Sequence, residues 1–79
     1  MIERKIIPVD DQNSINVVSE QMNDGRWAVV ASITHRTPTG EKVIDLPVRD
    51  TRYRDQAEAE DAGLRQARDY LDRNISHAA

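Results

Sequence analysis

The histidines and one pair of adjacent aspartates are the residues best suited to hold a metal ion. His35 and His77 lie far apart in the sequence, and neither has a second ligand at a spacing that metal sites use. Asp10 and Asp11 offer oxygen ligands, but the alternating ligands and central glycine of a calcium loop do not follow them. We therefore expect solvated or packing histidines, an ordinary loop at the aspartates, and neither a metal nor a cofactor.

The other reactive side chains show no catalytic pattern. The serines have neither a nucleophile elbow nor a neighbouring base, and the carboxylates Asp45 and Asp50 lack the apolar setting typical of a catalytic acid. The glycines are scattered over turns and a helix, so they form no loop that could cradle a phosphate. We therefore expect that the protein is not an enzyme.

Basic side chains gather around one aromatic ring in the middle third of the chain. Arginines hold phosphates and rings stack on bases, so this composition suits a single-stranded nucleic-acid binder. Residues 26–54 hold six basic against three acidic side chains, but the whole chain carries a net charge of −3, which disfavours nucleic acid as a partner. The alternative to nucleic-acid binding is that these arginines are solvent-exposed and pair with Asp50 and Asp55. The candidate nucleic-acid-binding residues are Arg36, Lys42, Arg49, Arg52, Tyr53 and Arg54.

Alternating apolar residues predict the strands that must position these groups. The clearest runs from Arg26 to Arg36, where Trp27 and every second residue after it face one side of a sheet. An Asn-Asp-Gly turn precedes it, and the apolar residues before that turn complete a hairpin. A second turn leads to a third strand over Glu41 to Arg49, with Pro47 indicating an edge or an end. Residues 2–9 are either a fourth, peripheral strand or an extended arm, followed by a loop.

From Asp55 onward the apolar period becomes that of a helix, over residues 55–75. Asp55 and Glu58 have capping-box spacing. Gly63, inside the helix, either marks a close approach to another backbone or is simply tolerated. The residues predicted to pack on the sheet are Ala57, Leu64, Ala67, Leu71 and Ile75.

Together these elements predict an α+β fold: an antiparallel meander of three, or as many as four, strands with one long C-terminal helix packed on one face. The face that the helix leaves uncovered is here called the open face. If the Trp27 set faces the helix, the open face carries small, partly apolar side chains where charged ones are usual, which suggests a homodimer or partner interface. The alternative is a mildly apolar surface without a partner. The candidate interface residues are Val30, Ser32, Thr34 and Val43.

Length and composition set the limits of this interpretation. A chain of 79 residues with 38% apolar residues allows a single domain, residues 1–79, divided into a peripheral strand or arm and loop (1–13), a meander (14–49) and a helix (55–75). The absence of cysteine excludes a disulfide miniprotein and a zinc ribbon. No apolar run is long enough for a bilayer or a signal peptide, so we expect no membrane association and a cytoplasmic location.

The sequence also resembles a family of small uncharacterised bacterial domains in which a Trp-containing β-meander is followed by an alanine-rich C-terminal helix. The residues that carry the resemblance are the strand led by Trp27, the segment from Tyr53 to Leu64, and Ala67-Arg68 and Tyr70-Leu71-Asp72. The resemblance implies the fold and implies no activity. We therefore expect a noncatalytic interaction module that self-associates through the open face or an edge strand, with nucleic-acid binding as the alternative and the partner undetermined.

Overall fold

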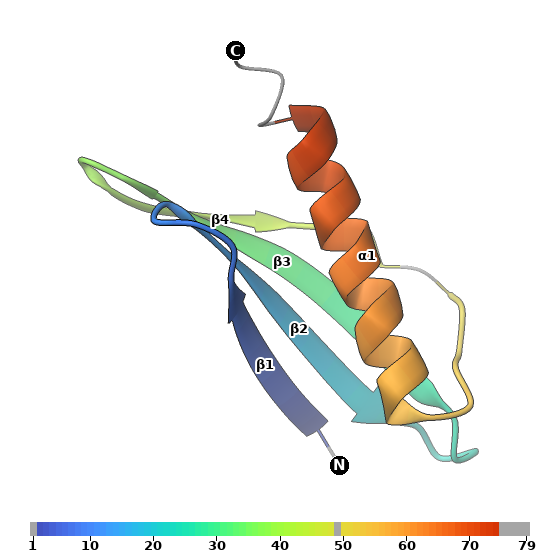
Figure 1. Cartoon of the computed structure of the whole chain (residues 1–79). Coiled ribbons are helices and arrows are strands. Elements are labelled where there is room, and N and C mark those ends of the chain that lie inside the picture. The colour runs from blue at the N-terminus through green and yellow to red at the C-terminus, as the bar shows by residue number, and fades with distance from the viewer. Residues whose placement is uncertain (1, 49, 75–79) are drawn as a thin grey trace.

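A computed structural model describes residues 2–48 and 50–74, which form one antiparallel sheet in the order β1-β2-β3-β4 and one helix packed against it (Figure 1). The predicted α+β meander is thus confirmed, and residues 2–8 form a strand, not an arm. The last strand is shorter than predicted because it stops before Pro47, which cannot donate a ladder hydrogen bond. The elements are β1 (Ile2–Pro8), β2 (Asn13–Gln21), β3 (Trp27–Thr37), β4 (Gly40–Asp45) and α1 (Gln56–Asn74).

Tight turns hold the strands in register. In the turn between β2 and β3, Gly25 has a φ of 85°, a conformation that glycine adopts without strain, and the Asp24 carboxylate accepts a hydrogen bond from Arg26 N at 3.0 Å. The resulting register places Val17 opposite Ala31, and Ile33 opposite both Ile15 and Ile44. The hairpin predicted around Asn23-Asp24-Gly25 is therefore present.

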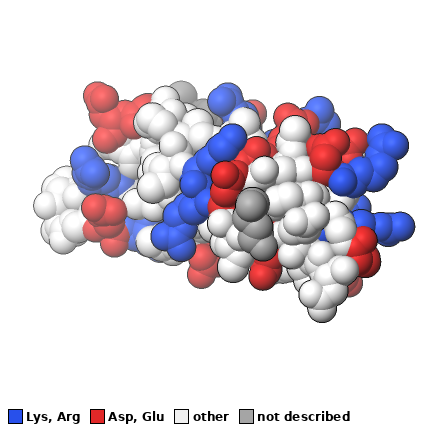
Figure 2. Space-filling view, turned by 90° about the horizontal axis from the view of Figure 1, so that it is seen from below, with Lys and Arg blue, Asp and Glu red and all other residues white. Residues whose placement is uncertain are grey.

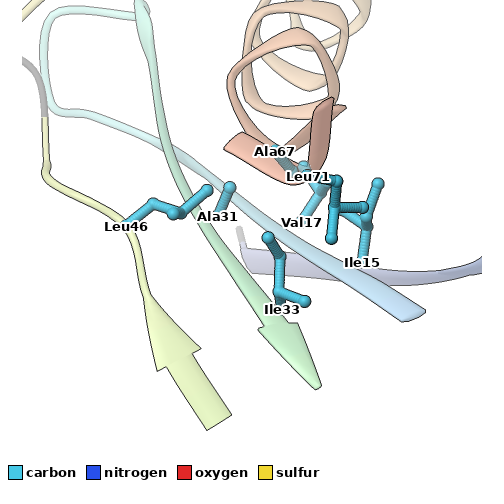
Figure 3. Close-up of a cluster of buried hydrophobic side chains, with 7 residues drawn as sticks. All are labelled: Ile15, Val17, Ala31, Ile33, Leu46, Ala67 and Leu71. Atoms are coloured by element: carbon cyan, nitrogen blue, oxygen red, sulfur yellow. The ribbon is translucent and has the colours of Figure 1, made fainter. Parts of the chain in front are cut away.

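The buried core lies between α1 and the central strands β2 and β3. Ile15 and Ile33 are completely buried, and they pack with the other apolar residues of the cluster shown in Figure 3. Trp27 is half-buried and lies outside this cluster, although the rest of its alternating set faces the helix, which is the arrangement assumed for the candidate interface. The buried apolar cluster consists of Ile15, Val17, Ala31, Ile33, Leu46, Ala67 and Leu71.

The residues of the helix that contact the sheet differ slightly from those predicted. Ala67 and Leu71 are buried as expected, but Ala57 is exposed, and Ala59 and Gly63 take its place on the sheet. The prediction for Ala57 was wrong because the helix lies with its smallest side chains closest to the strands. Leu64 is half-buried at the flank of the core, and Ile75 lies outside the described residues.

Polar contacts tie β1 to the helix. Lys5 Nζ forms an ion pair with Glu60 Oε1 at 3.2 Å, and Gln56 donates a hydrogen bond to the Glu3 carboxylate. Because side chains alternate along a strand, these contacts fix the odd-numbered residues of β1 on the helix side and send the even-numbered ones to the other side. No helix in the described part of the chain is long and apolar enough to cross a membrane.

Loss of the helix cap should measurably weaken the fold. Asp55 Oδ1 accepts a hydrogen bond from Glu58 N at 2.9 Å, which satisfies one of the free amide groups at the start of α1. We expect Asp55→Ala to lower the free energy of unfolding in urea by about 1 kcal/mol. Asp61→Ala is the matched control, because it removes only an exposed ion pair with Arg65 and should cost about 0.3–0.5 kcal/mol. Equal losses in the two variants would contradict the capping role.

Candidate functional site: the open face of the sheet

The open face is the side of the sheet turned away from α1. Residues opposite each other in an antiparallel pair project to the same side, so the strand register defines this face as transverse rows of side chains. Its rows are Ile2–Glu20–Ala28, Arg4–Val18–Val30, Ile6–Asn16–Ser32–Asp45, Pro8–Ser14–Thr34–Val43 and Arg36–Glu41. Within the described residues no other element lies over these rows (Figure 1).

The structure brings the candidate interface residues together on this face. Val30 is 41% exposed and Val43 is 60% exposed, whereas Ser32 and Thr34 are half-buried between their neighbours. Thr34 lies directly opposite Val43 in the register, and Ser32 shares the next row. All four side chains therefore belong to one continuous surface.

The open face carries further apolar residues that were not predicted, among them Ile6 and Val18. Ile6 is 64% exposed, and Val18 is half-buried beside it. For Ile6, the sequence signal was the alternation of Arg4 and Ile6 with Lys5 and Ile7, which places Ile6 on one face of a strand. This signal assigns Ile6 to the open face only once residues 2–8 are known to pair with β2. Ile6 and Val18 extend the apolar surface from β3 across the sheet to β1.

The polar centre of the open face is hydrogen-bonded within itself. Asn16 Nδ2 donates to Thr34 Oγ1 at 2.9 Å and to Ser32 Oγ at 3.3 Å. Beside this network lies a shallow depression of about 260 Å³, lined by Arg4, Ile6, Asn16, Val18 and Ser32. Polar groups that already have partners lose less when water is removed, so this face can be covered by another surface at a reduced cost.

The candidate nucleic-acid-binding residues do not form one patch. Tyr53 pairs with Trp27 at the start of β3, whereas Arg36 lies nine residues further along the same strand, roughly 30 Å away at 3.3 Å per residue. Arg36 and Lys42 project to opposite sides of the sheet, because their register partners are Glu41 and His35.

The loop arginines are held by local partners. Arg54 forms an ion pair with Glu58 at 3.5 Å, and the Arg52 guanidinium donates to the main-chain oxygens of Asp50 and Thr51 at 3.1 and 3.4 Å. Arg49 lies outside the described residues. The face of the molecule seen in Figure 2 carries basic and acidic side chains interspersed, without a broad field of one sign.

A hydrogen-bonded chain that the sequence did not reveal links the turn after β1 to β3. The Asp10 carboxylate accepts hydrogen bonds from Gln12 N and Asn13 N, both at 2.8 Å, and from Asn13 Nδ2 at 3.1 Å. Asn13 is only 5% exposed, and its Oδ1 lies 2.7 Å from His35 Nδ1. Since Asn13 uses its amide nitrogen on Asp10, His35 Nδ1 must carry the proton and donate to Asn13 Oδ1.

These groups brace the turn. In residues 2–48 and 50–74, no group of three or more metal-ligating side chains is close enough to hold an ion. His77, the other histidine, lies outside those residues. The spacing Asp10-x-x-Asn13 was the sequence signal for the braced turn, because an aspartate commonly caps main-chain amides two and three residues later.

The braced turn predicts a specific acid sensitivity. Hydrogen bonds from Gln12 N, then from the side chain of Asn13 and from Asn13 N, together with the nearby charge of His35, lower the pKa of Asp10 below its ordinary value of 3.8. A lowered pKa in the folded state stabilises the fold above the ordinary value, and this stabilisation is lost as the pH falls through the lowered one. We expect Asp10→Asn to reduce the loss of stability between pH 6 and the acid limit, measured from urea midpoints.

Asp11→Asn is the matched control for this measurement, because the Asp11 carboxylate lies in the same turn and accepts no hydrogen bond from the described residues. It should retain the acid sensitivity of the unaltered protein. If Asp10→Asn and Asp11→Asn give the same pH dependence as the unaltered protein, the turn does not depend on the ionised Asp10.

Comparisons with protein-family models, curated sequences and solved structures found no match to this chain. The resemblance to small bacterial domains stays a prediction, and the function is inferred from the geometry of the chain itself.

Proposed function

We propose that this protein is a noncatalytic interaction module that self-associates through its open face. The observation that carries the proposal is the exposure of Val30 and Val43, 41% and 60%, on a sheet face that no other described element covers. A sheet needs apolar side chains on the face that packs against something, and polar ones suffice on a face that meets only water. The extent of the apolar surface, which reaches Ile6 on β1, therefore favours a face that is covered in the assembled protein.

The edges of the sheet are less suited to association. On β1, Lys5 is engaged by Glu60, and the strand ends at Pro8, while β4 carries the exposed charges of Glu41 and Lys42. Charged side chains and proline are features by which sheet edges resist pairing with another strand. We therefore assign the association to the open face and not to an edge strand.

A binding role fits the chemistry of the chain better than a catalytic one. The groups with the most developed hydrogen bonding, Asp10, Asn13 and His35, act together to brace a turn, and the centre of the open face presents small hydroxyl, amide and aliphatic side chains. The central side chains provide contact and hydrogen bonds, and the exposed charged ones at the borders suit pairing with a partner. A cytoplasmic location stays a prediction from the sequence.

The mass in solution tests the proposal. Sedimentation equilibrium should report the chain mass of 9.0 kDa at low micromolar concentration and a mass that rises toward twice this value as the concentration approaches about 1 mM. A mass of one chain at every concentration would contradict self-association. A parallel amide-shift titration with a mixed-sequence oligonucleotide distinguishes the alternative, because salt-dependent shifts at Arg36, Lys42, Arg52 and Arg54 would support nucleic-acid binding instead.

A further inference from the structure

We infer that the partner of the open face is a second copy of this chain, related by a two-fold axis parallel to the strands, with Arg4 of each copy facing Asp45 of the other. The inference rests on the proposed function and specifies its geometry. Two sheets that pack face to face keep their strands roughly aligned, with the side chains of both inner faces interleaved. A two-fold axis along the strand direction is one of two ways to achieve this for identical sheets.

The strand-parallel axis brings apolar and small polar side chains of the two copies together along the central strands, and at the border it places Ile6 against Asp45 of the partner subunit. It places β1 of one copy over β4 of the other and β2 over β3, and it allows no sliding along the strands, so each row meets the equivalent row of the second copy. Val18 then lies over Val30 of the partner subunit, and Pro8 lies over Val43 of the partner subunit. In the row between them, the hydrogen-bonded Asn16 meets Ser32 of the partner subunit.

The same axis brings opposite charges together at both borders of the interface. On the open face, Arg4 is the basic residue of β1, and β4 carries the acidic residues Glu41 and Asp45. Arg4 and Asp45 occupy adjacent rows, about 7 Å apart along the strand direction, a distance that an extended arginine side chain spans. Two equivalent pairs form, one at each border, because the interface is isologous.

The alternative axis, perpendicular to the strands, gives a poor match. It places β4 over β4 and β1 over β1, so the carboxylates of Glu41 and Asp45 from both copies share one border and the Arg4 side chains share the other. Like charges brought together at an interface oppose association. Charge complementarity therefore selects the strand-parallel arrangement.

The available area is sufficient for a reversible dimer. Four strands spaced about 4.8 Å apart and some five rows about 7 Å apart give a footprint of roughly 500 Å² per copy. The total of roughly 1,000 Å² lies at the lower limit for specific interfaces. The dimer should accordingly be weak, and charge pairs at its border should contribute visibly to its affinity.

Charge reversal tests the arrangement. In sedimentation equilibrium, Arg4→Asp and Asp45→Arg should each raise the dimer dissociation constant about tenfold or more, because each puts like charges at both borders. The double variant restores both pairs with inverted polarity and should return the constant to within about threefold of the unaltered protein. Both side chains are exposed, so far-ultraviolet circular dichroism should be unchanged in all three variants.

The results of these measurements distinguish an error in the strand-parallel arrangement from a failure of the proposed self-association. If the unaltered protein dimerises but the double variant is no tighter than the single variants, the strand-parallel arrangement is wrong and self-association stands. If the unaltered protein stays one chain at all concentrations, self-association itself fails, and the face is left for a different protein. Recovery in the double variant supports the pairing of Arg4 with Asp45 of the partner subunit.

Discussion

Val30→Arg is expected to return the protein to the mass of one chain, with the dissociation constant raised about 100-fold or more. Val30 lies in the middle of the open face and remains 41% exposed in the single chain, so an arginine there can extend into water without disturbing the core. In the dimer the same side chain would be inserted between the two sheets against Val18 of the partner subunit, in a space that holds a valine. Removing a guanidinium from water and overfilling this contact costs about 2–5 kcal/mol, which corresponds to the expected loss of affinity.

Val9→Arg is the matched control for Val30→Arg. Val9 is 43% exposed, almost the same fraction, but it follows the end of β1 and lies outside the paired strands. This variant adds the same charge and should keep the dissociation constant within a few-fold of the unaltered protein. Equal loss of association in the two variants would show that added charge, and not occupation of the open face, is responsible.

Gly63→Leu is expected to produce the largest loss of stability in the helix, lowering the free energy of unfolding by more than about 3 kcal/mol. A Cβ atom at this position would lie 2.8 Å from Val29 Cγ2 and 3.2 Å from Val17 Cγ1, so even one added carbon requires these valine side chains to give way. A leucine would separate α1 from β2 and β3. The loss is a large part of the roughly 4–12 kcal/mol that a domain of this length has available.

Ala57→Leu is the control that isolates the close approach. Ala57 lies on the same helix but is exposed, so a leucine there should change the free energy of unfolding by less than about 0.5 kcal/mol. Urea unfolding followed by circular dichroism measures both variants. Destabilisation by Ala57→Leu as large as that by Gly63→Leu would mean that the helix does not rest on the sheet through Gly63.

The periodicity of the sequence was sufficient to predict most of the fold. Alternation after Trp27 predicted the central strand and divided its residues between two faces, but it left open which face the helix covers. Ala67 and Leu71 predicted the side of the helix that contacts the sheet. The error at Ala57 arose because periodicity identifies the larger apolar residues, whereas the helix is oriented by its smallest ones, Ala59 and Gly63, where the backbone can come closest to the strands. Only the packed structure shows whether the larger apolar residues or the smallest residues determine which side of the helix faces the sheet.

The candidate sites differ in how far the sequence could predict them. The interface residues lie two apart on β3 and directly across on β4, so strand geometry alone placed them on one face. The nucleic-acid candidates were grouped by their nearness in sequence, but β4 and the following connection carry Arg52 and Tyr53 back to the opposite end of β3 from Arg36. The hydrogen bond from His35 to Asn13 joins residues 22 positions apart, and it depends on the strand register that places them opposite each other.

The most direct test of the open face as a binding surface is an amide-shift dilution series of the unaltered protein. Between about 10 µM and 1 mM, a range that brackets the affinity of a weak dimer, the amide signals of Val18, Val30, Ser32 and Val43 should move together along one binding curve. Signals from the exposed side of α1, such as those of Asp61, Arg65 and Arg68, should stay fixed. Concentration-dependent shifts confined to the helix, or no shifts at any concentration, would contradict the account.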